Sequence, residues 1–76
     1  MSTLSADAIA LVRRFTERLM RDPVLTVTLS HFEGLPWEEV DGGVERDAGR
    51  QILRIEKDQI ITIMTDGMAG GIRQPL

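Results

Sequence analysis

The sequence predicts an α+β domain in which one N-terminal helix packs on a three-stranded antiparallel sheet, in the order α-β-β-β. Three observations lead to this fold class. Apolar residues recur at spacings of three and four over residues 4–21, and apolar and polar residues alternate over residues 24–31. Two further strand-like segments, 51–57 and 59–65, are separated by a short turn. A helix that covers one face of so small a sheet supplies the apolar layer that the sheet needs.

The helix expected over residues 4–21 is amphipathic. Ser5 is a suitable N-cap, and Asp7 lies in the first turn, where a negative charge is favoured. The helix ends before Pro23, since the residue that precedes a proline avoids the α region. Its apolar stripe consists of Leu4, Ala8, Leu11, Val12, Phe15 and Leu19.

Each of the three expected strands has a face for the core. Both faces of the segment 59–65 are largely apolar, which is typical of a strand that is covered on both sides. We therefore expect a second copy or a partner to cover Ile60, Met64 or their neighbours. His31 would end the first strand, at the rim of the sheet. The residues expected to face the helix are Leu25, Val27, Leu29, Leu53, Ile55, Ile61 and Ile63.

An acidic connection joins the first two strands, and its only base between residues 33 and 47 is Arg46. Pro36 to Asp41, followed by two glycines, has the pattern of one helical turn, with proline at the first position. A hairpin between Val40 and Val44 is the alternative; we favour the helical turn. The acids of this connection are Glu33, Glu38, Glu39, Asp41, Glu45 and Asp47.

Trp37, the only tryptophan, lies among these acids and has two interpretations. It can cover the end of the helix-on-sheet layer, or it can be an exposed anchor for a partner, since tryptophan is enriched in binding hot spots. The core position is favoured. The arginines of residues 4–21 also leave two cases open: they either neutralise the acidic connection or lie apart from it and make the molecule electrically polar.

Composition narrows the function classes. The 76 residues include 12 acids and 9 bases, for a net charge of −3, with one histidine and no cysteine. Cysteine chemistry is therefore excluded. Free DNA or RNA is not an expected ligand, because affinity for nucleic acid comes mostly from neutralised phosphates. We find no catalytic or cofactor motif, and residues 41–47 do not fit a calcium-binding loop.

The length predicts one domain over residues 1–76, with residues 67–76 as a loose tail. No apolar run approaches the length of a membrane-spanning helix, so we expect a cytoplasmic protein without a membrane partner.

These observations favour a small, acidic, non-enzymatic binding protein without cofactor or metal. Its partner would be a larger protein with a basic surface, and the acids would imitate the phosphates that a nucleic-acid-binding groove expects. Phage-borne inhibitors of bacterial defence, such as anti-CRISPR proteins, share this general character. The alternative is an assembly component of a phage particle or multiprotein complex, and a homodimer fits the apolar third strand. The expected partner-binding residues are Glu33, Trp37, Glu38, Glu39, Asp41, Glu45 and Asp47.

Overall fold

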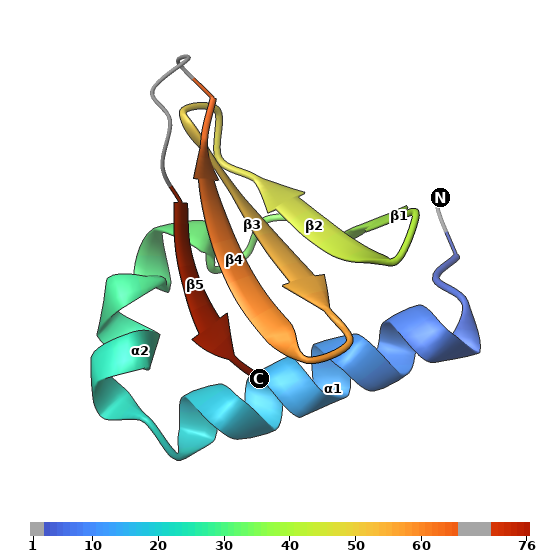
Figure 1. Ribbon diagram of the computed structural model, residues 1–76, viewed down its shortest axis with the longest axis horizontal. Coiled ribbons are helices and arrows are strands. Elements are labelled where there is room, and N and C mark those ends of the chain that lie inside the picture. Colours follow the sequence, from blue (N-terminus) through green and yellow to red (C-terminus); the bar gives the residue numbers. More distant parts are fainter. Residues whose placement is uncertain (1–2, 66–70) are drawn as a thin grey trace.

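The computed structural model describes residues 3–65 and 71–76, which form two helices, one 3₁₀ turn and five strands (Figure 1). The helical elements are α1 (Ala6–Met20), α2 (Pro23–Thr28) and the 3₁₀ turn η1 (Ser30–Phe32). The strands are β1 (Glu38–Val40), β2 (Gly43–Asp47), β3 (Gln51–Glu56), β4 (Gln59–Met64) and β5 (Gly71–Pro75).

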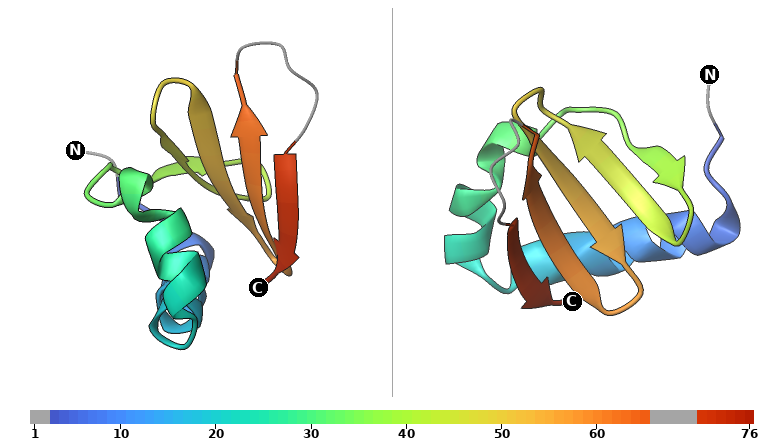
Figure 2. Two further views of the ribbon diagram at one scale, coloured as in Figure 1. Left: turned by 90° about the vertical axis from the view of Figure 1, so that its left-hand side faces the viewer. Right: turned by 45° about the horizontal axis from the view of Figure 1, so that its top comes forward.

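The strands form one antiparallel sheet in which each strand pairs with its neighbour in sequence, in the order β1-β2-β3-β4-β5. Both helices lie on the same side of this sheet, and α1 crosses beneath the strands (Figure 2). The predicted class, an N-terminal helix on an antiparallel sheet, is confirmed. The predicted number of strands is wrong, because the sheet has five strands and not three.

α1 follows the sequence prediction closely. The hydroxyl of Ser5 accepts a hydrogen bond from the backbone N–H of Ala8, at 3.2 Å, and so caps the helix. Phe15, in the middle of the apolar stripe, is buried against the sheet. Asp22 separates α1 from α2 with an extended backbone, as expected for a residue before proline.

The strand predicted over residues 24–31 is wrong, because this segment forms α2 and η1. Pro23 occupies the start of α2, and the Asp22 carboxylate accepts a hydrogen bond from the backbone N–H of Leu25 at 3.0 Å. The buried residues are Leu25, Leu29 and Phe32, spaced by four and three residues. A spacing of four satisfies both the helical period and the alternation of a strand, so Leu25 and Leu29 fit either pattern. Phe32 fits only the helix.

The polar side chains of this segment also form hydrogen bonds that are typical of a helix. Three hydroxyls donate hydrogen bonds to backbone carbonyl oxygens one turn earlier: Thr26 to Asp22 at 3.1 Å, Thr28 to Val24 at 2.8 Å, and Ser30 to Val27 at 2.8 Å. These residues, the polar members of the alternation over residues 24–31, are exposed on a helical segment. His31 belongs to η1 and does not end a strand.

The helical turn predicted within residues 36–43 is also wrong, because these residues include the β1–β2 hairpin. Gly42 has a φ of 88°, a conformation that favours glycine, and it completes the turn after Asp41. Gly43 lies so close to β3 that a side chain there would collide with the backbone carbonyl oxygen of Ile55. The two glycines that suggested a helix end therefore shape a hairpin.

The core lies between the sheet and the helical layer. Its buried residues are Ala8, Phe15, Leu25, Leu29, Phe32, Val44, Leu53, Ile55 and Ile60, and Leu11, Val12, Leu19, Leu35, Trp37 and Leu76 pack against them. Val27, assigned to the core from the alternation, is 73% exposed.

The face of β4 was also assigned wrongly. Ile60 pairs with Ile55, and opposite residues of an antiparallel pair point to the same side, so Ile60 faces the helices. Ile61 and Ile63 therefore face away from them. Ile60 is buried within its own chain, without the second copy or partner expected to cover it.

Part of the predicted loose tail is a strand. β5 pairs with β4 from Gly71 to Pro75, and the backbone N–H of Leu76 donates a hydrogen bond to the carbonyl oxygen of Asp58 at 3.0 Å. Leu76 packs against the core. The rest of the predicted tail, residues 67–70, lies outside the described residues.

Candidate protein-binding surface

In the part of the chain that the structure describes, one side of the sheet carries no helix, as the edge-on view in Figure 2 shows. We call this side the open face. The strand register determines which residues it contains, because side chains alternate along each strand and match across each pair. The open face includes Glu38, Glu45, Asp47, Ile52, Arg54, Glu56, Ile61, Ile63 and Arg73.

The centre of the open face is apolar. Ile61 is only 5% exposed, although no helix formed by the described residues lies over it. In the register it lies between Arg54 of β3 and Arg73 of β5, whose long aliphatic stems are suited to lie over an apolar neighbour. Ile63 is 36% exposed and Ile52 is half-buried. This part of the surface combines isoleucines with a polar rim.

Carboxylates dominate the β1–β2–β3 half of the open face. Arg54 is the cation among them: its Nε donates to Glu45 Oε2 at 2.7 Å, and its Nη1 is 3.6 Å from Glu56 Oε1. The side chain of Glu45 is 17% exposed and that of Glu56 is 38% exposed. One guanidinium therefore lies between two carboxylates, and Glu38 and Asp47 add two more acids to the same face.

The six predicted acids do not form one array. The register places Glu38, Glu45 and Asp47 together on the open face. Asp41 is exposed in the hairpin turn, and Glu33 is exposed just after η1. The Asp47 carboxylate also accepts a hydrogen bond from the backbone N–H of Gly49 at 2.7 Å, which shapes the β2–β3 turn.

Glu39 lies on the opposite side of the sheet from this acidic group. Its two carboxylate oxygens accept hydrogen bonds from Ser5, one from the backbone N–H at 2.9 Å and one from the hydroxyl at 2.7 Å. The bond from the backbone N–H, followed by that from the hydroxyl, lowers the pKa of Glu39 below its ordinary value. This predicted binding residue thus fastens the hairpin to the start of α1.

Trp37 is half-buried and belongs to the rim of the core. Its ring meets that of Phe15 edge-to-face, with centroids 5.6 Å apart, and the guanidinium of Arg46 lies over the ring, 4.2 Å from its centroid. The favoured core position is therefore confirmed. Burial lowers the pKa of Arg46, and its Nε has no hydrogen-bond partner among the described residues.

The arginines of α1 lie in the layer on the other side of the sheet from the open face. Arg14 donates a hydrogen bond to the carbonyl oxygen of Lys57 at 2.7 Å, and Arg18 pairs with Asp22 at 2.8 Å. In the described part of the chain, the ion pairs of α1 do not reach the acids of the hairpin. The arginines of α1 therefore do not neutralise the acids of the open face through ion pairs.

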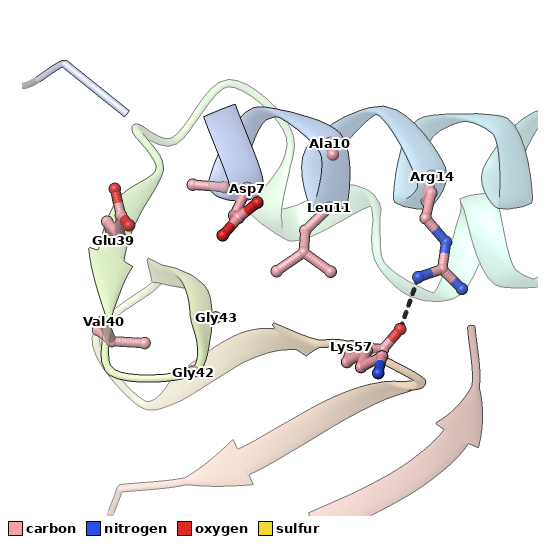
Figure 3. Close-up of a pocket in the computed structure, with 10 residues that line it drawn as sticks. Asp7, Ala10, Leu11, Arg14, Glu39, Val40, Gly42, Gly43 and Lys57 are labelled. Carbon is pink, nitrogen blue, oxygen red and sulfur yellow. Dashed lines mark hydrogen bonds between the residues drawn. The ribbon is translucent and has the colours of Figure 1, made fainter. Parts of the chain in front are cut away.

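A groove of about 450 Å³ separates α1 from the hairpin (Figure 3). Asp7 and Glu39 lie at one end of it, and Arg14 and Lys57 at the other. The Glu39 carboxylate and the Arg14 guanidinium are already engaged by the protein, as described above. Two of the four charged side chains at its ends therefore serve contacts within the fold, and the open face remains the stronger candidate site.

Residues 3–65 and 71–76 give little support to a catalytic histidine, a metal site or a membrane-spanning helix. The Nε2 atom of His31 lies 2.7 Å from Gln51 Oε1, so the histidine is held by an amide rather than by a carboxylate. These residues contain no cluster of three or more histidines and carboxylates arranged to hold a metal ion. None of the helices that they form has the length and apolar character to cross a membrane.

Three charged residues of the open face were missing from the sequence prediction of the site: Arg54, Glu56 and Arg73. The alternation over residues 51–57 already separates Arg54 and Glu56 from Leu53 and Ile55, and this was the signal that could have identified them. Arg73 had no such signal, because its segment was expected to be loose.

Comparisons of the chain with protein-family models, with curated proteins and with solved structures find no match.

Proposed function

We propose that this protein is an acidic, non-enzymatic binding module whose open face covers a basic surface on a larger protein or complex. The observation that carries the proposal is the segregation of charge. Four carboxylates and an isoleucine cluster share the open face, whereas the α1 arginines lie in the layer on the other side of the sheet.

The physical mechanism combines long-range attraction with short-range contact. Carboxylates on one side of a small molecule orient it toward a basic surface and raise the association rate. Glu38 and Asp47 are exposed for this role, while Ile63 offers apolar area at the centre of the contact. Basic protein surfaces of this kind commonly bind phosphates, so the partner would be a nucleic-acid-binding complex, and the effect would be inhibition. This is the anti-CRISPR-like role expected from the sequence.

The test begins with capture of the partner from host lysate and its identification by mass spectrometry. Binding kinetics are then measured at two salt concentrations for a double variant, Glu38→Lys with Glu56→Lys. Neither carboxylate bonds to α1, unlike that of Glu39, so the fold is expected to persist. The matched control is Glu17→Lys with Asp58→Lys, which changes the net charge equally at exposed sites outside the open face.

We expect the open-face variant to associate about tenfold more slowly at low salt, with a much smaller difference at high salt, because salt screens the attraction. The control variant should associate at close to the wild-type rate. Equal rates for all three proteins at low salt would show that the acids are ordinary solvated surface.

A second candidate function, an assembly component, is favoured by a different observation. Met20, Val24 and Val27 are exposed by 80, 76 and 73%, so the corner between α1 and α2 presents apolar side chains to solvent. Exposed apolar patches on small proteins often mark contact sites. This corner lies on the side of the molecule where the sheet also ends, at β5.

A further inference from the structure

The helical layer leaves a groove open between α2 and β5. Figures 1 and 2 show the two elements side by side at the same end of the molecule. The groove has a volume of about 420 Å³, and its lining includes Leu29 of the helical layer and Thr62, Met64 and Ile72 of the sheet.

Ile72 of β5 faces the helical layer. It pairs with Thr62, which itself pairs with the core residue Leu53, so the side chain of Ile72 points to the helix side. It is nevertheless 63% exposed. The apolar layer is thus incomplete at this end.

The same end of the molecule has an unpaired sheet edge. β5 is the last strand of the sheet, and no strand formed by the described residues pairs with its outer side. An edge strand presents backbone N–H and C=O groups that can pair with another extended chain. A strand added there would direct every second side chain into the groove beside α2.

We propose that β5 and the groove beside α2 bind an extended segment of a partner protein, which adds to the sheet as a sixth strand. This is the mode in which backbone hydrogen bonds supply affinity and pockets for alternate side chains supply specificity. The side chain opposite Ile72 would be apolar and would fill the groove between β5 and Leu29.

The charge of Arg73 indicates which residue would lie next to the apolar one in the partner segment. Arg73 follows Ile72 and lies on the open face of β5, where it is exposed. A residue opposite it in an added strand would be its direct cross-strand neighbour, and opposite charges are favoured in such pairs. The chemistry that fits is therefore a segment in which apolar and acidic residues alternate.

A second copy of this chain fits the edge less well. Antiparallel pairing of β5 with itself over its whole length would place Arg73 opposite Arg73, and like charges at directly opposite positions are destabilising. A register with Ile72 opposite Ile72 would pair only residues 71–73 of each strand. In the full-length pairing, Pro75 also has no N–H to donate.

The experiment selects peptides from a displayed library of random nonapeptides with the purified full chain. Recovered peptides are measured by titration and mapped on the ¹⁵N-labelled protein by amide shifts and hydrogen exchange. The test variants are Ile72→Thr, which keeps a β-branched side chain, and Arg73→Glu. The matched control is Ile9→Thr, at an isoleucine of α1 that is 46% exposed and does not line the groove.

We expect recovered peptides with alternating apolar and acidic residues, and binding at least tenfold weaker to Ile72→Thr but unchanged in Ile9→Thr. Arg73→Glu should select basic residues in place of the acids. In the wild-type protein, bound peptide should slow hydrogen exchange at the amides of β5, a measurement that does not depend on the folding of a variant.

Three results would overturn the inference. The first is no enrichment of peptides above a selection without protein, and the second is binding that Ile72→Thr leaves unchanged. The third is a concentration-dependent dimer that Ile72→Thr abolishes, which would show that a second copy of the chain occupies the β5 edge. Because Glu38 and Glu56 lie outside this groove, the outcome is independent of the charge-reversal test of the open face.

Discussion

Two single substitutions, Phe32→Ala and Val27→Ala, distinguish the observed helical segment from the strand that the sequence suggests. In the structure Phe32 is 1% exposed and belongs to the core, whereas Val27 is 73% exposed. In the strand interpretation the roles are exchanged, because Val27 would face the core and Phe32 would lie beyond the strand.

The structure gives the expected magnitudes. Truncation of a buried phenylalanine to alanine costs roughly 3–5 kcal/mol, through lost apolar burial and the cavity that remains. A domain of this size has a total stability of roughly 4–11 kcal/mol, so Phe32→Ala removes a large part of it. At roughly 4–8 °C per kcal/mol, the melting temperature should fall by more than about 12 °C. Val27→Ala should change stability by less than about 0.5 kcal/mol, because the residue is exposed and alanine is a good helix former.

The assay is urea unfolding followed by the fluorescence of Trp37, which reports on the core because its ring contacts Phe15. Far-UV circular dichroism should give the same midpoint if unfolding is two-state. A Phe32→Ala midpoint close to that of the wild type, with a loss of roughly 1.5 kcal/mol in Val27→Ala, would refute the helical arrangement.

Two further predictions concern the hairpin. The pKa of Glu39 is lowered in the folded protein, so its stabilising effect is present above its ordinary value of 4.5 and is lost as the pH falls through the lowered folded value. The urea midpoint should therefore fall between pH 6 and pH 3, and the fall should be smaller in Glu39→Gln; an equal fall in both proteins would contradict the role of the Ser5 contacts. Asp22 contributes in the same direction, because the N–H of Leu25 and then Arg18 lower its pKa. Gly43→Ala should destabilise the protein by roughly 1–3 kcal/mol, because the new methyl group meets the carbonyl oxygen of Ile55. Ala10→Ser, at an exposed position of α1, is the control for a small change in volume, and a Gly43→Ala midpoint equal to that of the control would refute the close approach.

The sequence by itself determined the elements whose signals are local. The apolar stripe, the Ser5 cap and Pro23 together place α1, because each acts within one or two turns of the chain. The alternation over residues 51–57 predicted a strand and its two faces correctly, since Leu53 and Ile55 are buried while Arg54 and Glu56 belong to the open face.

Tertiary structure decided the cases in which a local pattern fitted two arrangements. Leu25 and Leu29 satisfy the periods of both a strand and a helix, and the burial of Phe32 together with the exposure of Val27 selects the helix. β4 is apolar on both faces, so its orientation depends on its register with Ile55 and not on its own sequence.

In the candidate surface, too, the sequence determined some features and the tertiary structure decided the others. The sequence identified the acids, but pairing in space determined that Glu38, Glu45 and Asp47 share the open face and that Glu39 turns to Ser5. Residues 71–75 form a strand because they pair with β4. The segment is short and has glycine and proline at its ends, so its local sequence does not predict a strand. Charge and periodicity are properties of the chain, whereas the side of the molecule on which a residue lies is a property of strand register and helix packing.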